Sequence, residues 1–206
     1  MIQLGLWPFL LGRHSRNLRA RITYPLWIAA GKAAPDNHAY KTKRILRVAR
    51  EYSCETFVET GTFYGQTVAA MSSHFRKVFS CELSARLWDL NRRSFAAKSN
   101  VNILLGDSAT VLNEVIREIS GRTLFWLDGH YSGPGTALGD QVSPVLGELA
   151  AIRKHHRNDH CILVDDARLF TGSNGYPTLE SLRLGLRKIN AAYEISVNGD
   201  CIIALP

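Results

Sequence analysis

Two patterns of apolar residues alternate along the chain and predict its elements. Short β-prone runs recur, and the stretches between them carry apolar residues at the helical spacing i, i+3, i+4 and i+7. The predicted strands are Thr56–Glu59, Lys77–Cys81, Val101–Leu105, Thr123–Leu127 and Cys161–Val164. Helices are predicted around residues 45–52, 66–74, 83–90, 111–119, 145–152 and 179–189. A regular series of strands and helices predicts a parallel sheet with helices on both faces.

The last part of the chain departs from that series. The segment YEISVNGDCIIAL places two β-prone runs around Asn198-Gly199. Asn-Gly between two such runs is the strongest short-range signal for a β-hairpin. The whole pattern therefore predicts seven strands, mostly parallel, that end in one antiparallel hairpin. A plain dinucleotide-binding domain would not predict this hairpin.

The turn after the first predicted strand holds residues that suit a bound ligand. In E-T-G-T-F-Y-G, the glycines Gly61 and Gly65 let the backbone approach a ligand, and the next helix start offers free N–H groups. Glu82 ends the second strand, where an acid can accept hydrogen bonds from both ribose hydroxyls. The turn lacks the G-x-G-x-x-G of dinucleotide sites, and no P-loop motif occurs. Glu59, just before the turn, suits a ligand that carries an ammonium group.

E-T-G-T-x-x-G followed by C-E-L-S resembles motif I and the ribose acid of class I S-adenosylmethionine-dependent methyltransferases. The resemblance implies an α/β, Rossmann-like fold with the seven-stranded sheet described above, and S-adenosylmethionine as the cofactor. It implies that Glu82 holds the ribose, that Asp107 with Ser108 faces the adenine, and that residues 59–65 hold the methionine end. The cofactor-binding residues implied are Glu59, Thr60, Gly61, Thr62, Gly65, Glu82, Leu83, Gly106, Asp107, Ser108 and Asp128.

Acidic residues end each of the five leading strands. They are Glu59, Glu82, Asp107, Asp128 and the pair Asp165-Asp166. Ligands of open α/β sheets bind outside the carboxyl ends of the strands, so these acids should gather at one edge. Capping of the next helix is the alternative for Asp107 and Asp166. Five acids at five strand ends would repel one another, which indicates a cationic ligand or a metal.

Three of these acids carry a second resemblance. The motif L-D-G-H-Y, with Asp128, and the downstream V-D-D, with Asp165 and Asp166, resemble metal-dependent O-methyltransferases that tailor macrolide and aminocoumarin sugars. This resemblance implies Mg²⁺ held by the three aspartates, which offer the hard oxygen ligands that the ion prefers. Those enzymes have a further aspartate where this chain has His130. We predict His130 and Asp128 as the catalytic residues, with His130 as the base; a loop histidine that binds backbone is the alternative.

Length and charge divide the chain unevenly. Its 206 residues predict one domain with an appendage. The formal net charge is +7, and residues 1–34 hold five basic residues and no acid, so the body carries only about +2. So small an excess argues against nucleic-acid binding by the body. We divide the chain into a basic, apolar arm or helical appendage at 1–40 and a S-adenosylmethionine-binding domain at 41–206; the resemblance covers about 45–206.

The arm allows more than one interpretation. Its apolar start is far shorter than the ~20 residues that span a bilayer, and its charges follow that start, the reverse of a signal peptide. Peripheral membrane contact through residues 1–30 is one interpretation. Docking over the active site, or on a second subunit of a homo-oligomer, is another. Four scattered cysteines without a C-x-x-C pair predict reduced thiols and a cytoplasmic location.

Three functions are compatible with these patterns. The first is a metal-assisted O-methyltransferase that acts on a hydroxyl of a small molecule or saccharide. The second is an NAD-linked oxidoreductase or epimerase on a related sheet; the missing third glycine and the absence of a Tyr-x-x-x-Lys pair count against it. The third is a non-catalytic nucleotide-binding module that docks through its basic arm. The intact acids at the strand ends argue against this third function. The acceptor cannot be read from the sequence, because acceptor pockets vary independently of fold.

Overall fold

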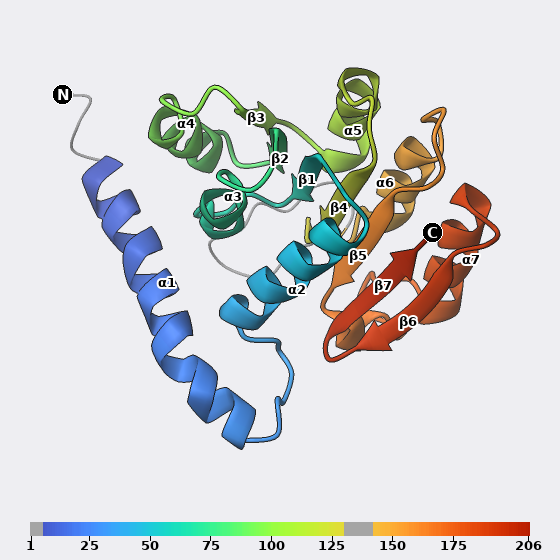
Figure 1. Cartoon of the computed structure of the whole chain (residues 1–206), viewed down its shortest axis with the longest axis horizontal. Helices are drawn as coiled ribbons and strands as arrows, with labels where there is room; N and C mark the ends of the chain where they lie inside the picture. The colour runs from blue at the N-terminus through green and yellow to red at the C-terminus, as the bar shows by residue number, and fades with distance from the viewer. Residues whose placement is uncertain (1–5, 130–141) are drawn as a thin grey trace.

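A single mixed sheet forms the centre of the protein (Figure 1). The computed structural model describes residues 6–129 and 142–206, and in these the sheet has seven strands in the order β3-β2-β1-β4-β5-β7-β6. The strands are β1 (Thr56–Thr60), β2 (Lys77–Glu82), β3 (Val101–Leu105), β4 (Thr123–Leu127), β5 (Cys161–Asp165), β6 (Glu194–Asn198) and β7 (Cys201–Leu205). β1 to β5 are parallel, and β7 is antiparallel to both β5 and β6. The predicted sheet and its closing hairpin are confirmed.

Helices cover both faces of the sheet, as predicted. α2 (His38–Glu51), α3 (Gln66–Met71) and α4 (Ala85–Ser94) lie on one face, and α5 (Ser108–Glu118), α6 (Val145–Ile152) and α7 (Leu179–Ile189) lie on the other. Neighbouring residues of a strand point to opposite faces. Accordingly, Phe57 of β1 packs in the cluster under α2 and α3, whereas Val58 packs in the cluster under α5, α6 and α7.

Side chains just after the strands start the next helices. Ser84 accepts a hydrogen bond from Leu87 N at the start of α4, and Asp107 accepts one from Thr110 N at the start of α5. Such caps bind backbone N–H groups that have no partner inside the helix. The capping interpretation of Asp107 is therefore confirmed. For Asp166, which precedes the short 3₁₀ helix η1 (Ala167–Leu169), no side-chain cap bond is formed.

One predicted helix is shorter than expected. The apolar spacing predicts a helix over 66–74, but α3 ends at Met71. The chain must turn there to enter β2, and Asn100 binds the turn by donating from its amide to Ser72 O and Phe75 O. These tertiary bonds give two carbonyls of the turn a partner outside the helix.

The predicted arm contains one long helix, α1 (Leu6–Ala29). It lies at the periphery (blue in Figure 1) and contacts α2, α3 and α4. Phe9 and Arg13 are its buried residues, and Phe9 packs with Leu87 and Leu90 of α4. Among the described residues, no helix combines the length and the apolarity needed to cross a membrane.

Candidate active site

The glycine turn after β1 brings the ends of β1, β2 and β4 together. Gly61 has a φ of +83°, and its N–H donates to Cys81 O of β2. A Cβ atom at this position would lie 2.4 Å from the carbonyl oxygen of Asp128. The Thr60 hydroxyl oxygen accepts a hydrogen bond from Asp128 N at 3.0 Å. Glycine is therefore required here by a close approach of two backbone segments, not only by the positive φ.

Glu82 binds this turn from the end of β2. Its Oε2 accepts a hydrogen bond from Phe63 N at 2.7 Å, and its Oε1 accepts one from Ser84 N at 2.9 Å. Burial raises the pKa of Glu82, while these backbone bonds oppose the rise. The predicted ribose acceptor thus lies beside the turn and fixes its shape.

Glu59 is buried at the end of β1, where it is 2% exposed. Its Oε2 accepts a hydrogen bond from the Ser80 hydroxyl at 2.7 Å, and Ser80 is bonded in turn to the hydroxyl of Thr62. Burial raises the pKa of Glu59 to about 8, with smaller contributions from Asp128 and Glu82. A cation bound nearby would favour the ionised carboxylate, in line with its predicted role toward an ammonium group.

Ser108 faces an acid that the sequence analysis missed. The Ser108 hydroxyl donates to Glu148 Oε1 of α6 at 2.5 Å, and Glu148 is buried. A Cβ added to Gly129 would lie 3.0 Å from that oxygen and 3.2 Å from the Ser108 hydroxyl. The ends of β3 and β4 and the start of α6 therefore meet here. The signal was available, since Glu148 is the single charge in the otherwise apolar helix VLGELAAI.

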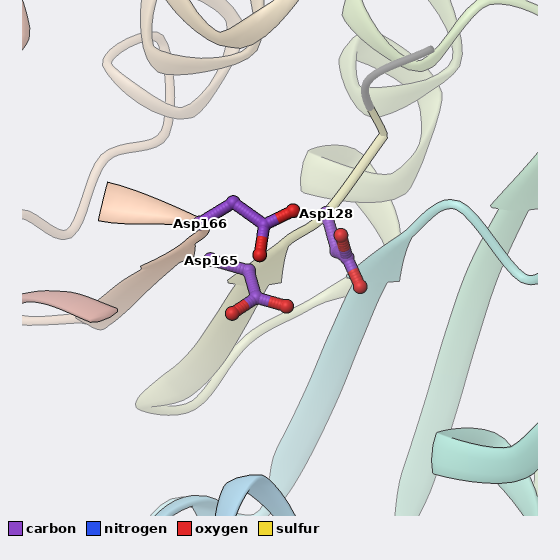
Figure 2. Close-up of side chains that lie close together, drawn as sticks. All are labelled: Asp128, Asp165 and Asp166. Carbon is purple, nitrogen blue, oxygen red and sulfur yellow. The ribbon is translucent and has the colours of Figure 1, made fainter. Parts of the chain in front are cut away.

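Three aspartates gather at the ends of β4 and β5 (Figure 2). One carboxylate oxygen each of Asp128, Asp165 and Asp166 lies within 4.8 Å of the others. Asp166 has a φ of +56°, an uncommon conformation for a residue with a side chain. Burial and the charge of Asp128 raise the pKa of Asp165 to about 8, against the effect of Lys41. The structure thus brings the predicted metal ligands together.

Lys41 of α2, which was not among the predicted site residues, also reaches this cluster. Its ammonium donates to Asp165 Oδ2 and lies 4.0 Å from Asp166 Oδ1. Burial lowers the pKa of Lys41, but the charges of Asp165, Asp128 and Asp166 outweigh it and hold the pKa above its ordinary value. The signal was its position, because Lys41 lies four residues before Ile45 on the apolar face of the helix.

The aspartate cluster fits a divalent cation by its chemistry. Three carboxylates supply oxygen ligands of the kind that Mg²⁺ takes. Asp165 Oδ1 is buried and has no hydrogen-bond partner among the described residues, so it could accept an ion. The ligands would be Asp128, Asp165 and Asp166. The ammonium of Lys41 lies against the same cluster.

A third residue that was not predicted, Arg13, ties α1 to the glycine turn. The buried guanidinium of Arg13 donates from Nε to Tyr64 O at 2.6 Å, and from Nη2 to Asn91 Oδ1 at 3.1 Å and Ser94 Oγ at 2.7 Å. It also lies over the Phe95 ring, 4.4 Å from its centroid. Burial lowers the pKa of Arg13 to about 10, so it remains charged near neutral pH.

Three predicted site residues remain: Gly106, Leu83 and His130. Gly106 has a φ of +140° and donates from its N–H to Glu82 O, and Leu83 is partly exposed next to Glu82. His130, the predicted base, lies outside the described residues. The roles given to all these residues toward a cofactor stay predictions.

Solved structures resemble this chain in fold. A methyltransferase from Podospora anserina with S-adenosylhomocysteine bound matches with a TM-score of 0.56 at 16% identity, over 94% of this chain and 86% of that chain. An O-methyltransferase from Bacillus cereus, also with S-adenosylhomocysteine, matches with a TM-score of 0.54 at 12% identity, over 91% and 90%. An O-methyltransferase from Streptomyces achromogenes, in complex with S-adenosylmethionine, matches with a TM-score of 0.53 at 14% identity, over 81% and 79%.

Sequence comparison adds nothing to these matches, since no family model and no curated protein matches the chain. Identities this low support a statement about fold alone. The strand order β3-β2-β1-β4-β5-β7-β6 and the antiparallel β7 agree with that statement. The chain has the Rossmann-like fold of class I methyltransferases.

Proposed function

We propose that this protein transfers the methyl group of S-adenosylmethionine to a hydroxyl group of a small molecule or saccharide. The observation that carries the proposal is the arrangement of buried and half-buried acids around the glycine turn. Glu59 and Glu82 flank the turn at the ends of β1 and β2, and the three aspartates lie beside it at the ends of β4 and β5. A cofactor with a sulfonium and an ammonium group would meet both sets of acids.

The reaction needs little covalent help from the protein. A bond forms between the acceptor oxygen and the methyl carbon while the bond from that carbon to sulfur breaks, and S-adenosylhomocysteine leaves. The carbon is already activated, so alignment of the two reactants supplies much of the rate. In this proposal Glu82 binds the ribose, Ser108 and Asp107 border the adenine, and Glu59 with the turn binds the methionine end.

The acceptor hydroxyl must also lose its proton. A Mg²⁺ ion held by Asp128, Asp165 and Asp166 would lower the pKa of an acceptor hydroxyl that binds to the ion. His130, two residues after Asp128, is proposed to take the proton. The acceptor would then lie at the outer ends of β4 and β5.

Calorimetry with three ligands tests the proposal. S-adenosylmethionine and S-adenosylhomocysteine should bind, and NAD should not. The same titrations with and without Mg²⁺ test the ion separately from the cofactor. Binding of NAD in preference to the other two would replace the methyltransferase with the oxidoreductase or epimerase. Binding of all three with no turnover of any hydroxyl compound would favour the nucleotide-binding module.

A further inference from the structure

Lys41 lies where a cation of the aspartate cluster is expected. It comes from the first turn of α2, and its side chain crosses to the end of β5, 124 residues further along the chain. Its side chain is 17% exposed, whereas that of Asp165 is fully buried. Lys41 is thus almost enclosed with the carboxylates, so the pair is screened little by solvent.

The Lys41 ammonium and a metal ion would compete for the carboxylate of Asp165. Its Oδ2 accepts the Lys41 hydrogen bond, and only the buried Oδ1 is without a partner among the described residues. A divalent ion within ligand distance of these oxygens would lie a few ångströms from a second positive charge. Like charges at that distance in a buried site repel strongly. The ammonium and the metal therefore exclude each other at Asp165.

We propose that Lys41 is the built-in cation of the three-aspartate cluster, and that a divalent ion binds only when the ammonium leaves Asp165. This proposal concerns the metal site of the proposed function and adds a residue that controls its occupancy. The long, flexible stem of lysine allows the ammonium to move without a change in α2. While the Lys41 ammonium contacts Asp165, it balances part of the negative charge of the three aspartates without a metal.

The test is the affinity of the full-length protein for Mn²⁺, measured without cofactor or acceptor. Lys41→Met keeps the apolar stem and removes the charge, and it should bind Mn²⁺ at least about tenfold tighter than the wild type. Lys41→Arg keeps a cation and should not gain affinity. Adding Asp165→Asn to Lys41→Met should abolish the gain. Equal or weaker Mn²⁺ affinity in Lys41→Met, including no binding by either protein, would overturn the proposal.

A second measurement needs no variant. The Lys41 ammonium can be followed by nitrogen NMR in the wild type while Mg²⁺ is added. A signal that shifts in proportion to Mg²⁺ binding supports displacement, and a signal that is unchanged at saturation contradicts it. Neither experiment contains S-adenosylmethionine. Failure of the methyl-transfer proposal would therefore appear in the cofactor titrations alone.

The outer face of α1 carries an independent inference. Five large apolar side chains on it are between 59% and 71% exposed: Trp7, Leu11, Leu18, Ile22 and Leu26. Their spacing of four, seven, four and four residues places them along one side of the helix. The opposite side faces the body, where Phe9 and Arg13 are buried. We call the five exposed residues the outer stripe.

The charges around the outer stripe favour one kind of occupant. Arg19 and Arg21 are exposed beside it, and residues 1–34 hold no acid. A second copy of the chain would bring the same cations to the same surface, where they would repel. A bilayer with anionic lipids offers apolar depth and opposite charge together, which is the environment of an amphipathic helix that lies in the interface. The geometry points to an anionic membrane surface as the partner of the outer stripe.

Vesicle binding of the full chain tests this second proposal. The protein should sediment with vesicles of phosphatidylcholine and phosphatidylglycerol, but not with phosphatidylcholine alone, and added salt should weaken the binding. The double variant Leu18→Glu, Ile22→Glu should lose at least about tenfold in affinity. Leu184→Glu, at an exposed leucine on α7, is the control and should bind like the wild type. No binding to anionic vesicles, or a stable dimer that the double variant dissociates, would overturn the proposal.

Discussion

The glycine turn after β1 is held from two sides, by backbone atoms on the side of the sheet and by side chains on the side of α1. Toward the sheet, Gly61 meets the backbone of Asp128 at the end of β4. Toward α1, Gly65 meets side chains, because a Cβ there would lie 2.4 Å from Asn91 Oδ1 and 3.2 Å from Arg13 Nη2. A backbone contact has almost no room to adjust, whereas a side chain can change its rotamer. The sheet edge should therefore tolerate change far less than the α1 side.

Gly61→Ala should have the largest effect. The added Cβ would meet the Asp128 carbonyl, and the positive φ adds strain, so we expect a loss of about 3 kcal/mol or more in the free energy of unfolding. S-adenosylmethionine binding should be lost as well. Urea unfolding and calorimetry measure the two effects.

Gly31→Ala is the matched control for that substitution. Gly31 also has a positive φ, +80°, but a Cβ there would meet no atom of the described residues within 4 Å. We expect a cost of about 1–2 kcal/mol from the backbone conformation alone. Equal losses in the two variants would show that the contact between β1 and β4 is not what requires glycine at position 61.

Glu82→Ala should have the next largest effect, on the cofactor. Removing the acid deletes the proposed ribose acceptor and the bonds to Phe63 N and Ser84 N. We expect S-adenosylmethionine binding to weaken by about 1.5–3 kcal/mol, measured by calorimetry. Wild-type affinity in this variant would remove Glu82 from the cofactor site.

Arg13→Ala tests the other side of the turn. The substitution leaves Tyr64 O, Asn91 Oδ1 and Ser94 Oγ without their donor, so the free energy of unfolding should fall by about 1–3 kcal/mol. Arg19→Ala, on the exposed side of α1, should change it by less than about 0.5 kcal/mol. If the two variants unfold alike in urea, α1 does not support the turn.

The sheet edge could be predicted from the sequence because short motifs report it. Parallel strands place their carboxyl ends at one edge, so the acid after each strand gives its position without any tertiary information. The positions of Glu59, Glu82 and the three aspartates followed in this way. Asp107 shows the limit of the argument, since the same position also suits a helix cap, which the structure confirms.

The contacts of α1 and α2 could not be predicted in the same way. Arg13 binds residues 51 to 81 positions away, and Lys41 binds a residue 124 positions away. No local pattern fixes which partner such a long side chain finds. Only the helical spacing indicates that these two side chains face the body, because Lys41 lies in line with Ile45 and Arg13 in line with Phe9. The division of the chain near residue 40 stays a prediction, and the burial of Arg13 indicates that the two parts stabilise each other.

The last expected effect concerns the buried acid of the turn and its dependence on pH. Burial raises the pKa of Glu59 from its ordinary value of 4.5 to about 8. Between these values the folded protein holds a proton that the unfolded chain has released, so the free energy of unfolding falls as pH rises. Glu59→Gln cannot ionise, and its amide oxygen can still accept the Ser80 hydrogen bond. The difference in the free energy of unfolding between variant and wild type should therefore grow by up to about 3.5 kcal/mol from pH 5 to pH 8, measured by urea unfolding. Asp165 should titrate alike in both proteins, so its contribution cancels in the difference between them. If the free energy of unfolding changed equally with pH in the two proteins, Glu59 would be ionised throughout this range.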